Sequence, residues 1–219
     1  MIRLQRLSFG LVLCLSLIPC LMCVNGAKAQ GASEITVAPQ VLEQYVGIYE
    51  LAPTFKITVT REASQLMVQA SGQPKLPVFA SSETKFFYKV VDAQIEFFKD
   101  AKGAVTHLVL YQNNQELKAP RTNEKIAERK EIPLSPAVMA QYAGTYELKP
   151  GFDLTVMQEG DQLFAQATGQ GKAQLFAESA TKFFYKVTDA QIEFFKDDKG
   201  MVTHLVLHQG PAEIKAMKK

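Results

Sequence analysis

Residues 45–51 read YVGIYEL and residues 142–148 read YAGTYEL, so the same motif returns 97 positions later. No gap is needed to align residues 45–112 with their counterparts in the second half. Units of this length indicate a duplicated domain of roughly 80 residues rather than a solenoid. Three further segments are identical at the same offset: FFYKV (86–90 and 183–187), IEFFKD (95–100 and 192–197) and VTHLVL (105–110 and 202–207).

Each unit reads as a series of short strands rich in Val, Ile, Thr, Phe and Tyr. Ser135-Pro136 suits an N-cap followed by the first helical position, so one short helix should precede each unit. Eight short strands favour a small closed antiparallel barrel, because closure removes exposed edges. The expected strands of the first unit are 47–51, 55–61, 66–70, 76–79, 85–91, 94–99, 105–111 and 116–119.

The predicted organisation is all-β, with two tandem eight-stranded barrels after an N-terminal signal peptide. The segment between the units is charged and poor in large apolar residues, which is typical of a linker. The expected bounds are 1–29 for the signal peptide, 37–120 for the first barrel, 121–133 for the linker and 134–219 for the second barrel.

The first 29 residues have the order of a cleaved signal peptide. A basic start at 1–6 is followed by an apolar stretch at 7–24 and by the A-x-A sequence at 27–29. An uncleaved anchor is the alternative, because about 18 apolar residues could just span a bilayer. The proline before Cys20 fits a lipoprotein signal poorly. We therefore expect a periplasmic or secreted protein that is free of the membrane after cleavage.

Cysteine and charge exclude several classes of function. Cys14, Cys20 and Cys23 all lie within the signal segment, so the mature chain would have no disulfide and no thiolate site. The signal segment also carries three basic residues and no acidic one, so its removal turns the net charge from +2 to −1. A near-neutral chain has no electrostatic footprint for nucleic acid.

One hairpin allows a prediction of register and of an aromatic surface. With Asp92-Ala93 as the turn, Lys89 would face Glu96 and Lys85 would face Asp100, giving two opposite-charge pairs. Two phenylalanines would share that charged, outward face, where another strand or the sister unit could cover them or a partner could bind them. The candidate partner-contact residues in the two copies are Phe87, Phe98, Phe184 and Phe195.

No group of residues forms a recognisable active site. Ser82-Glu-Thr-Lys85 and its counterpart at 179–182 fit S-x-x-K, but residues three apart in an extended chain point to opposite faces. His107, its counterpart His204, and His208 lack the clustered carboxylates or thiolates of a transition-metal site. We expect no catalytic residue, no metal site and no cofactor.

The ordered motifs resemble a known family. The segments at 45–51, 66–73, 86–87 and 96–100, repeated in the second unit, are similar to the small lipocalin-like C-terminal domain of beta-lactamase-related serine hydrolases. That domain is best known from an archaeal self-compartmentalising peptidase. The resemblance implies two lipocalin-like barrels that are non-catalytic and assist assembly or substrate gating. The hydrolase domain itself has no counterpart in this sequence, so its activity does not carry over.

The leading hypothesis is therefore an exported, non-catalytic module that docks a protein partner through exposed aromatic strand surfaces. The partner would be a separate serine hydrolase or a second copy. An alternative is a carrier of a small apolar ligand, although side chains such as Phe97 and Leu108 should fill so small a barrel. A degenerate serine hydrolase and a structural envelope component are the remaining alternatives.

Overall fold

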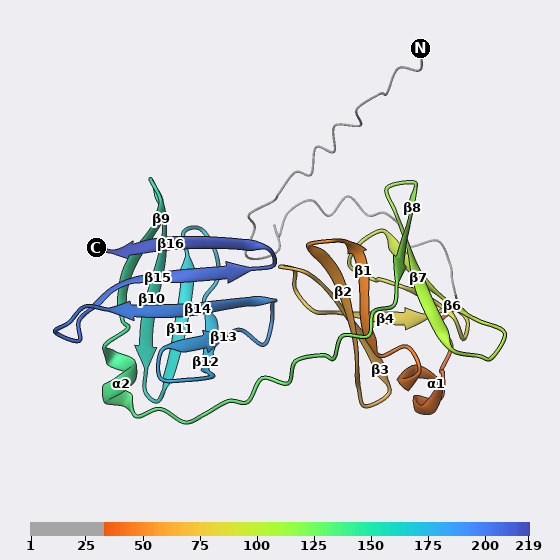
Figure 1. The fold of residues 1–219 in the computed structure, drawn as a ribbon, viewed down its shortest axis with the longest axis horizontal. Coiled ribbons are helices and arrows are strands. Elements are labelled where there is room, and N and C mark those ends of the chain that lie inside the picture. The colour runs from red at the N-terminus through yellow and green to blue at the C-terminus, as the bar shows by residue number, and fades with distance from the viewer. Residues whose placement is uncertain (1–32) are drawn as a thin grey trace, which may run out of the picture.

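The structure, a computed structural model, describes residues 33–219 and contains two barrels joined by an extended segment (Figure 1). The predicted signal peptide, residues 1–29, lies outside the described residues. The first barrel consists of α1 (Pro39–Glu43), β1 (Gly47–Ala52), β2 (Phe55–Glu62), β3 (Gln65–Ala70), β4 (Leu76–Ala80), β5 (Lys85–Phe87), β6 (Ala93–Lys99), β7 (Val105–Gln112) and β8 (Gln115–Pro120).

The second barrel repeats this order element for element. It consists of α2 (Pro136–Ala140), β9 (Gly144–Lys149), β10 (Phe152–Glu159), β11 (Gln162–Ala167), β12 (Ala173–Ala177), β13 (Lys182–Phe184), β14 (Ala190–Lys196), β15 (Val202–Gln209) and β16 (Ala212–Lys218). The predicted all-β fold of two eight-stranded antiparallel barrels, each preceded by a short helix, is confirmed.

Within each barrel every strand pairs with the next one along the chain, and the two barrels close differently. In the second barrel β16 pairs directly with β9 through Met217 and Lys218. In the first barrel β8 ends at Pro120, which has no N–H to donate to a ladder. Closure there is made by a bridge between Tyr49 and Arg121 and by the bond from Thr122 N–H to the Ile48 carbonyl, 2.8 Å long.

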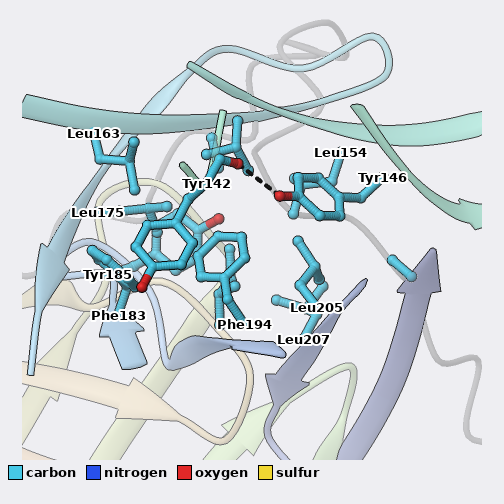
Figure 2. Close-up of a cluster of buried hydrophobic side chains, with 14 of the residues drawn as sticks. Tyr142, Tyr146, Leu154, Leu163, Leu175, Phe183, Tyr185, Phe194, Leu205 and Leu207 are labelled. Atoms are coloured by element: carbon cyan, nitrogen blue, oxygen red, sulfur yellow. Dashed lines mark hydrogen bonds between the residues drawn. The ribbon is translucent and has the colours of Figure 1, made fainter. Parts of the chain in front are cut away.

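The repeated Y-x-G-x-Y motif forms the centre of each core. The rings of Tyr142 and Phe194 stack with centroids 4.4 Å apart, and the Tyr146 hydroxyl donates to the Tyr142 carbonyl over 2.7 Å (Figure 2). The Tyr142 hydroxyl donates to the Ala180 carbonyl. Each of these two tyrosine hydroxyls thus has a partner, which is why tyrosine is tolerated in an apolar core. The first barrel repeats the arrangement with Tyr45, Tyr49, Glu83 and Phe97.

The glycine inside this motif lets a basic side chain cross the barrel seam, the line where the first and last strands of the barrel meet. A Cβ on Gly47 would lie 3.0 Å from Nε of Arg121, and one on Gly144 would lie 2.6 Å from Cε of Lys218. Arg121 uses this space to donate to the carbonyl oxygens of Gln44 and Val46. The motif therefore links core packing to closure of the barrel.

The predicted register of the β5–β6 hairpin is wrong by four residues. Lys85 pairs with Glu96 rather than with Asp100, because β5 stops at Phe87 and the turn is longer than two residues. The Asp100 carboxylate instead accepts the N–H groups of Lys102 and Ala104 within its own turn. A slip of an even number of residues keeps the side chains of Lys85, Phe86 and Phe87 on their predicted faces.

The charged segment between the units is attached to both barrels at its ends. At its start, Lys56 of β2 forms an ion pair with Glu124, with Nζ 2.6 Å from Oε1. At its end, the N–H of Ile132 donates to the Ala177 carbonyl over 2.8 Å, as Ile35 does to Ala80 in the first barrel. Ile132 is therefore attached to the second barrel as Ile35 is to the first, and the predicted bounds of linker and barrels remain predictions.

Candidate functional sites at the barrel contact and the barrel mouth

The four predicted partner-contact phenylalanines lie on the outward faces of their strands, but neighbouring side chains cover them to different degrees. Phe98 stacks on His107, with ring centroids 4.7 Å apart and planes within 2°. Phe195 stacks in the same way on His204 and is 37% exposed. Phe87 lies half-buried against Phe79. Adjacent strands therefore provide much of the cover.

The prediction that Phe184 is an exposed contact is wrong, because this ring is only 4% exposed. Phe176 packs on it from β12 at 5.9 Å, and the guanidinium of Arg129 lies 5.8 Å from the ring centroid. Arg129 comes from the segment between the barrels, which the hairpin pattern does not include. A continuous aromatic docking face is thus interrupted in the second barrel.

The two S-x-x-K sequences form turns. The Ser82 hydroxyl oxygen accepts the N–H of Lys85 at 3.0 Å, and Ser179 does the same for Lys182. The ammonium of Lys85 lies 3.3 Å from the Glu96 carboxylate. Serine and ammonium therefore serve local structure at these positions.

The histidines at 107 and 204 occupy matching outward positions. Burial lowers the pKa of His107 below its usual value, and nearby Lys118 lowers this pKa further. Burial and Lys215 lower the pKa of His204 in the same way. Among residues 33–219, no group of three or more His, Cys, Asp or Glu side chains is placed to hold a metal ion. The described part of the chain also has no helix long and apolar enough to cross a bilayer.

A specific contact joins the barrels through the β3–β4 loop of the first and the β13–β14 loop of the second. Pro74 and Thr188 form an antiparallel bridge. The Asp189 N–H donates to the Gln73 carbonyl over 3.2 Å, and the Asp189 carboxylate accepts the Gly72 N–H at 3.1 Å. This short piece of sheet is an interface formed largely by backbone groups.

A second pair of loops with similar sequence is present but makes no such contact. The counterpart of the β13–β14 loop in the first barrel is Val90–Asp92, where Val90 is 69% and Val91 42% exposed. Asp92 is exposed, whereas its counterpart Asp189 is half-buried in the contact. The counterpart of the β3–β4 loop in the second barrel, residues 168–172, is also mostly exposed. The chain thus uses one of its two loop pairs.

The turn beside this contact differs between the repeats. Gln209 donates from Nε2 to the Gly72 carbonyl over 2.9 Å, and Gly210 follows with a positive φ of 54°. A Cβ on Gly210 would lie only 3.1 Å from the backbone nitrogen of Gly72. The counterpart of Gly210 in the first barrel is Asn113, whose side chain would crowd a loop docked in the same way.

A cavity of about 150 Å³ opens at the mouth of the second barrel, next to the contact. Its wall contains Leu154, Ala165, Ala173 and Tyr185, and Pro74 of the first barrel contributes to its rim. Burial raises the pKa of the Tyr185 phenol, so this hydroxyl stays neutral. The cavity is therefore apolar apart from a few polar groups at its edge.

Comparison with known proteins places both repeats in one family. The family described as "Domain of unknown function (DUF3471)" matches residues 32–124 and 128–218, so the chain belongs to it, with two copies of the domain. A relative is penicillin-binding protein 4* of Bacillus subtilis, which is 34% identical over 82 residues. The match covers 37% of this chain and 18% of the relative. The narrower resemblance to the archaeal peptidase stays a prediction.

Sequence reasoning missed both the loop contact and the cavity. Pro74 and Thr188 are 114 positions apart and meet only through docking of the folded barrels. The cavity has a detectable signal, because aligning the repeats puts Ala165 and Ala173 where the first barrel has Val68 and Leu76. A loss of apolar volume at two positions of one copy indicates where the cores differ.

Proposed function

We propose that this chain is an exported, non-catalytic assembly module that docks a protein partner through the Val90–Asp92 loop of its first barrel. The observation that carries the proposal is the contact between the barrels, in which the sister loop at 187–189 binds an extended segment. The Val90–Asp92 loop has the matching carboxylate and two exposed valines. Adding a short strand to such an edge is a common mode of protein recognition.

We place the docking site on this loop and not on the predicted aromatic strands, because Phe184 is covered by its neighbours. Val90 and Val91 are adjacent in sequence and both exposed, and Lys89 holds Glu34, the neighbour of exposed Ile35, with Nζ 2.7 Å from Oε2. Exposed apolar side chains beside unpaired edge groups are typical of an interaction site. A backbone-led contact needs a partner that offers an extended loop, as residues 72–75 do inside this chain.

Two observations favour a serine hydrolase of the penicillin-binding kind over a second copy as this partner. The matched stretch of 82 residues makes up 18% of a penicillin-binding protein, so a sequence similar to one repeat occurs there within a much longer protein. In addition, Asn113 stands where Gly210 permits close approach, so the partner's loop must leave more room beside this turn than residues 72–75 of a second copy would.

Site-specific photo-crosslinking in the native cells tests this proposal. A benzophenone amino acid at Val90 should crosslink to a protein that a fluorescent penicillin labels, whereas the same probe at Met201, which is 66% exposed, should not. A Val90 crosslink to a second copy, or none, would contradict the hydrolase partner. The purified chain should remain unlabelled by a fluorophosphonate probe, and labelling would contradict the non-catalytic assignment.

The Asn113→Gly variant supplies a matched control. Removing this Cβ should permit the internal type of contact between copies, so the variant should form larger species in analytical ultracentrifugation than the unmodified chain does. Equal self-association of both chains would show that Asn113 does not disfavour the second copy.

A further inference from the structure

We infer that the mouth of the second barrel is a binding site for a small ring compound that is mostly apolar and carries one hydrogen-bond donor, of the phenol class. The site is the cavity of about 150 Å³ described above. An enclosed apolar cavity of this volume holds benzene or xenon in another protein, so the size fits one ring. This inference is independent of the docking loop.

The cavity arises from specific differences between the repeats. Its wall includes Ala165 and Ala173, whereas the first barrel has the larger Val68 and Leu76 at those positions. Val68 is 3% exposed, so its side chain fills space in the first core. Apolar surface that stays open to water at the barrel mouth gives up the free energy that its burial would contribute. The first barrel shows that larger side chains fit these two positions, so the space in the second barrel is better explained by an occupant than by the fold.

An unpaired polar atom supplies the second observation. Oε1 of Gln170, which lies in the cavity wall, is buried and has no hydrogen-bond partner. The side-chain amide of Gln166 lies nearby but donates to the backbone carbonyl of Gln170 over 2.8 Å. It therefore does not pair with the side-chain oxygen of Gln170. A buried acceptor without a donor is unfavourable. A ligand hydroxyl or amine would satisfy it, which is why a phenol suits the site better than benzene.

The remaining wall suits a ring. The Tyr185 side chain lies in the buried hydrophobic cluster of the second barrel (Figure 2), and burial raises the pKa of its phenol. Aromatic pairs with offset or edge-to-face geometry add to the gain from apolar burial. Pro74 reaches the rim from the first barrel, so the contact between barrels covers one side of the entrance. The ligand would therefore also stabilise the arrangement of the two barrels.

Titration of the isotopically labelled chain with phenol and with benzene, followed by amide NMR, tests the inference. We expect saturable shifts at Ala165, Ala173 and Tyr185, with the amides of the first barrel outside its β3–β4 loop as the internal reference. Phenol should bind several-fold more tightly than benzene, and Gln170→Leu should remove that preference. Equal affinity for both compounds in the unmodified chain would overturn the role of Gln170.

A filled-cavity variant provides the decisive control. Ala165→Val combined with Ala173→Leu restores the residues of the first barrel, which its core accommodates, and should weaken phenol binding at least tenfold. If that variant fails to fold, the single Ala165→Val change is measured instead and should still weaken binding. Unchanged affinity in a folded variant, or shifts spread equally over both barrels, would overturn the site.

Discussion

The two barrels of this chain share their aromatic centre and differ at their seam and mouth. Tyr45 stacks on Phe97 at 4.3 Å, and Tyr142 stacks on Phe194 at 4.4 Å. At the seam, one barrel closes through a β ladder and the other through a single bridge. At the mouth, two alanines replace larger residues in the second barrel alone. The two repeats thus share the aromatic centre of the core and differ at the seam and at the mouth, where the proposed cavity lies.

The largest expected effect tests whether the aromatic centres are equivalent. Phe97→Ala and Phe194→Ala should each lower the free energy of unfolding by about 3–5 kcal/mol, because each ring is 2% exposed and leaves a cavity. Chemical denaturation measures both losses. Phe195→Ala, on the adjacent and 37% exposed ring, is the control and should cost less than about 1 kcal/mol. A loss in only one barrel would break the equivalence.

An exchange of residues at the mouth should give effects of opposite sign. Val68→Ala removes buried methyl groups from a filled core and should destabilise the first barrel by about 2 kcal/mol. Ala165→Val adds them where space exists and should stabilise the second barrel by about 1 kcal/mol. Thermal unfolding of the two variants measures the difference. Destabilisation by both changes would mean that the second core has no usable space.

The seam should show a smaller difference. Arg121 donates to two backbone carbonyls, whereas Lys218 donates to one, that of Gln141, at 3.2 Å. Arg121→Ala should cost about 1 kcal/mol and Lys218→Ala about 0.5 kcal/mol, because both groups are partly solvated and exposed pairs contribute little. Denaturant unfolding compares them. A larger loss for Lys218→Ala would contradict the view that closure of the first barrel depends more on its basic side chain than closure of the second does.

The smallest expected effect is a pH dependence common to both barrels. The folded-state pKa values of His107 and His204 are lowered by burial, so the unfolded chain binds more protons near its ordinary histidine pKa. The free energy of unfolding should therefore fall slightly as pH drops from 8 to 6. The double variant His107→Gln, His204→Gln should reduce this slope. An unchanged slope would assign it to other groups.

Much of the fold was predictable because the repeat and the alternation of apolar residues specify strands and their inward faces. Phe86 and Phe97 point inward and Phe98 outward, as alternation requires. The register of β5 was not predictable from charge, since Asp100 satisfies its own turn and Lys85 reaches Glu96 instead. Local hydrogen bonds of an aspartate compete with cross-strand pairing, and sequence does not reveal which prevails.

The candidate sites were harder to predict because they depend on distant segments. Phe184 is covered by Arg129, which precedes the second barrel. The cavity needs the closed barrel to bring Ala165 and Ala173 together and the first barrel to supply Pro74. In the sequence, these features are indicated only by residues that differ between the two repeats. Such differences can be interpreted only when the strand register shows which residues face each other.

The central claim is that the two barrels have divided two tasks, with an exposed docking loop on the first and a small-molecule site in the second. A crystal of the chain pressurised with xenon tests the asymmetry of the cores most directly, because xenon marks empty apolar cavities. We expect xenon density beside Ala165, Ala173 and Tyr185 and none beside Val68 and Leu76. Density in both barrels, or in neither, would contradict the claim.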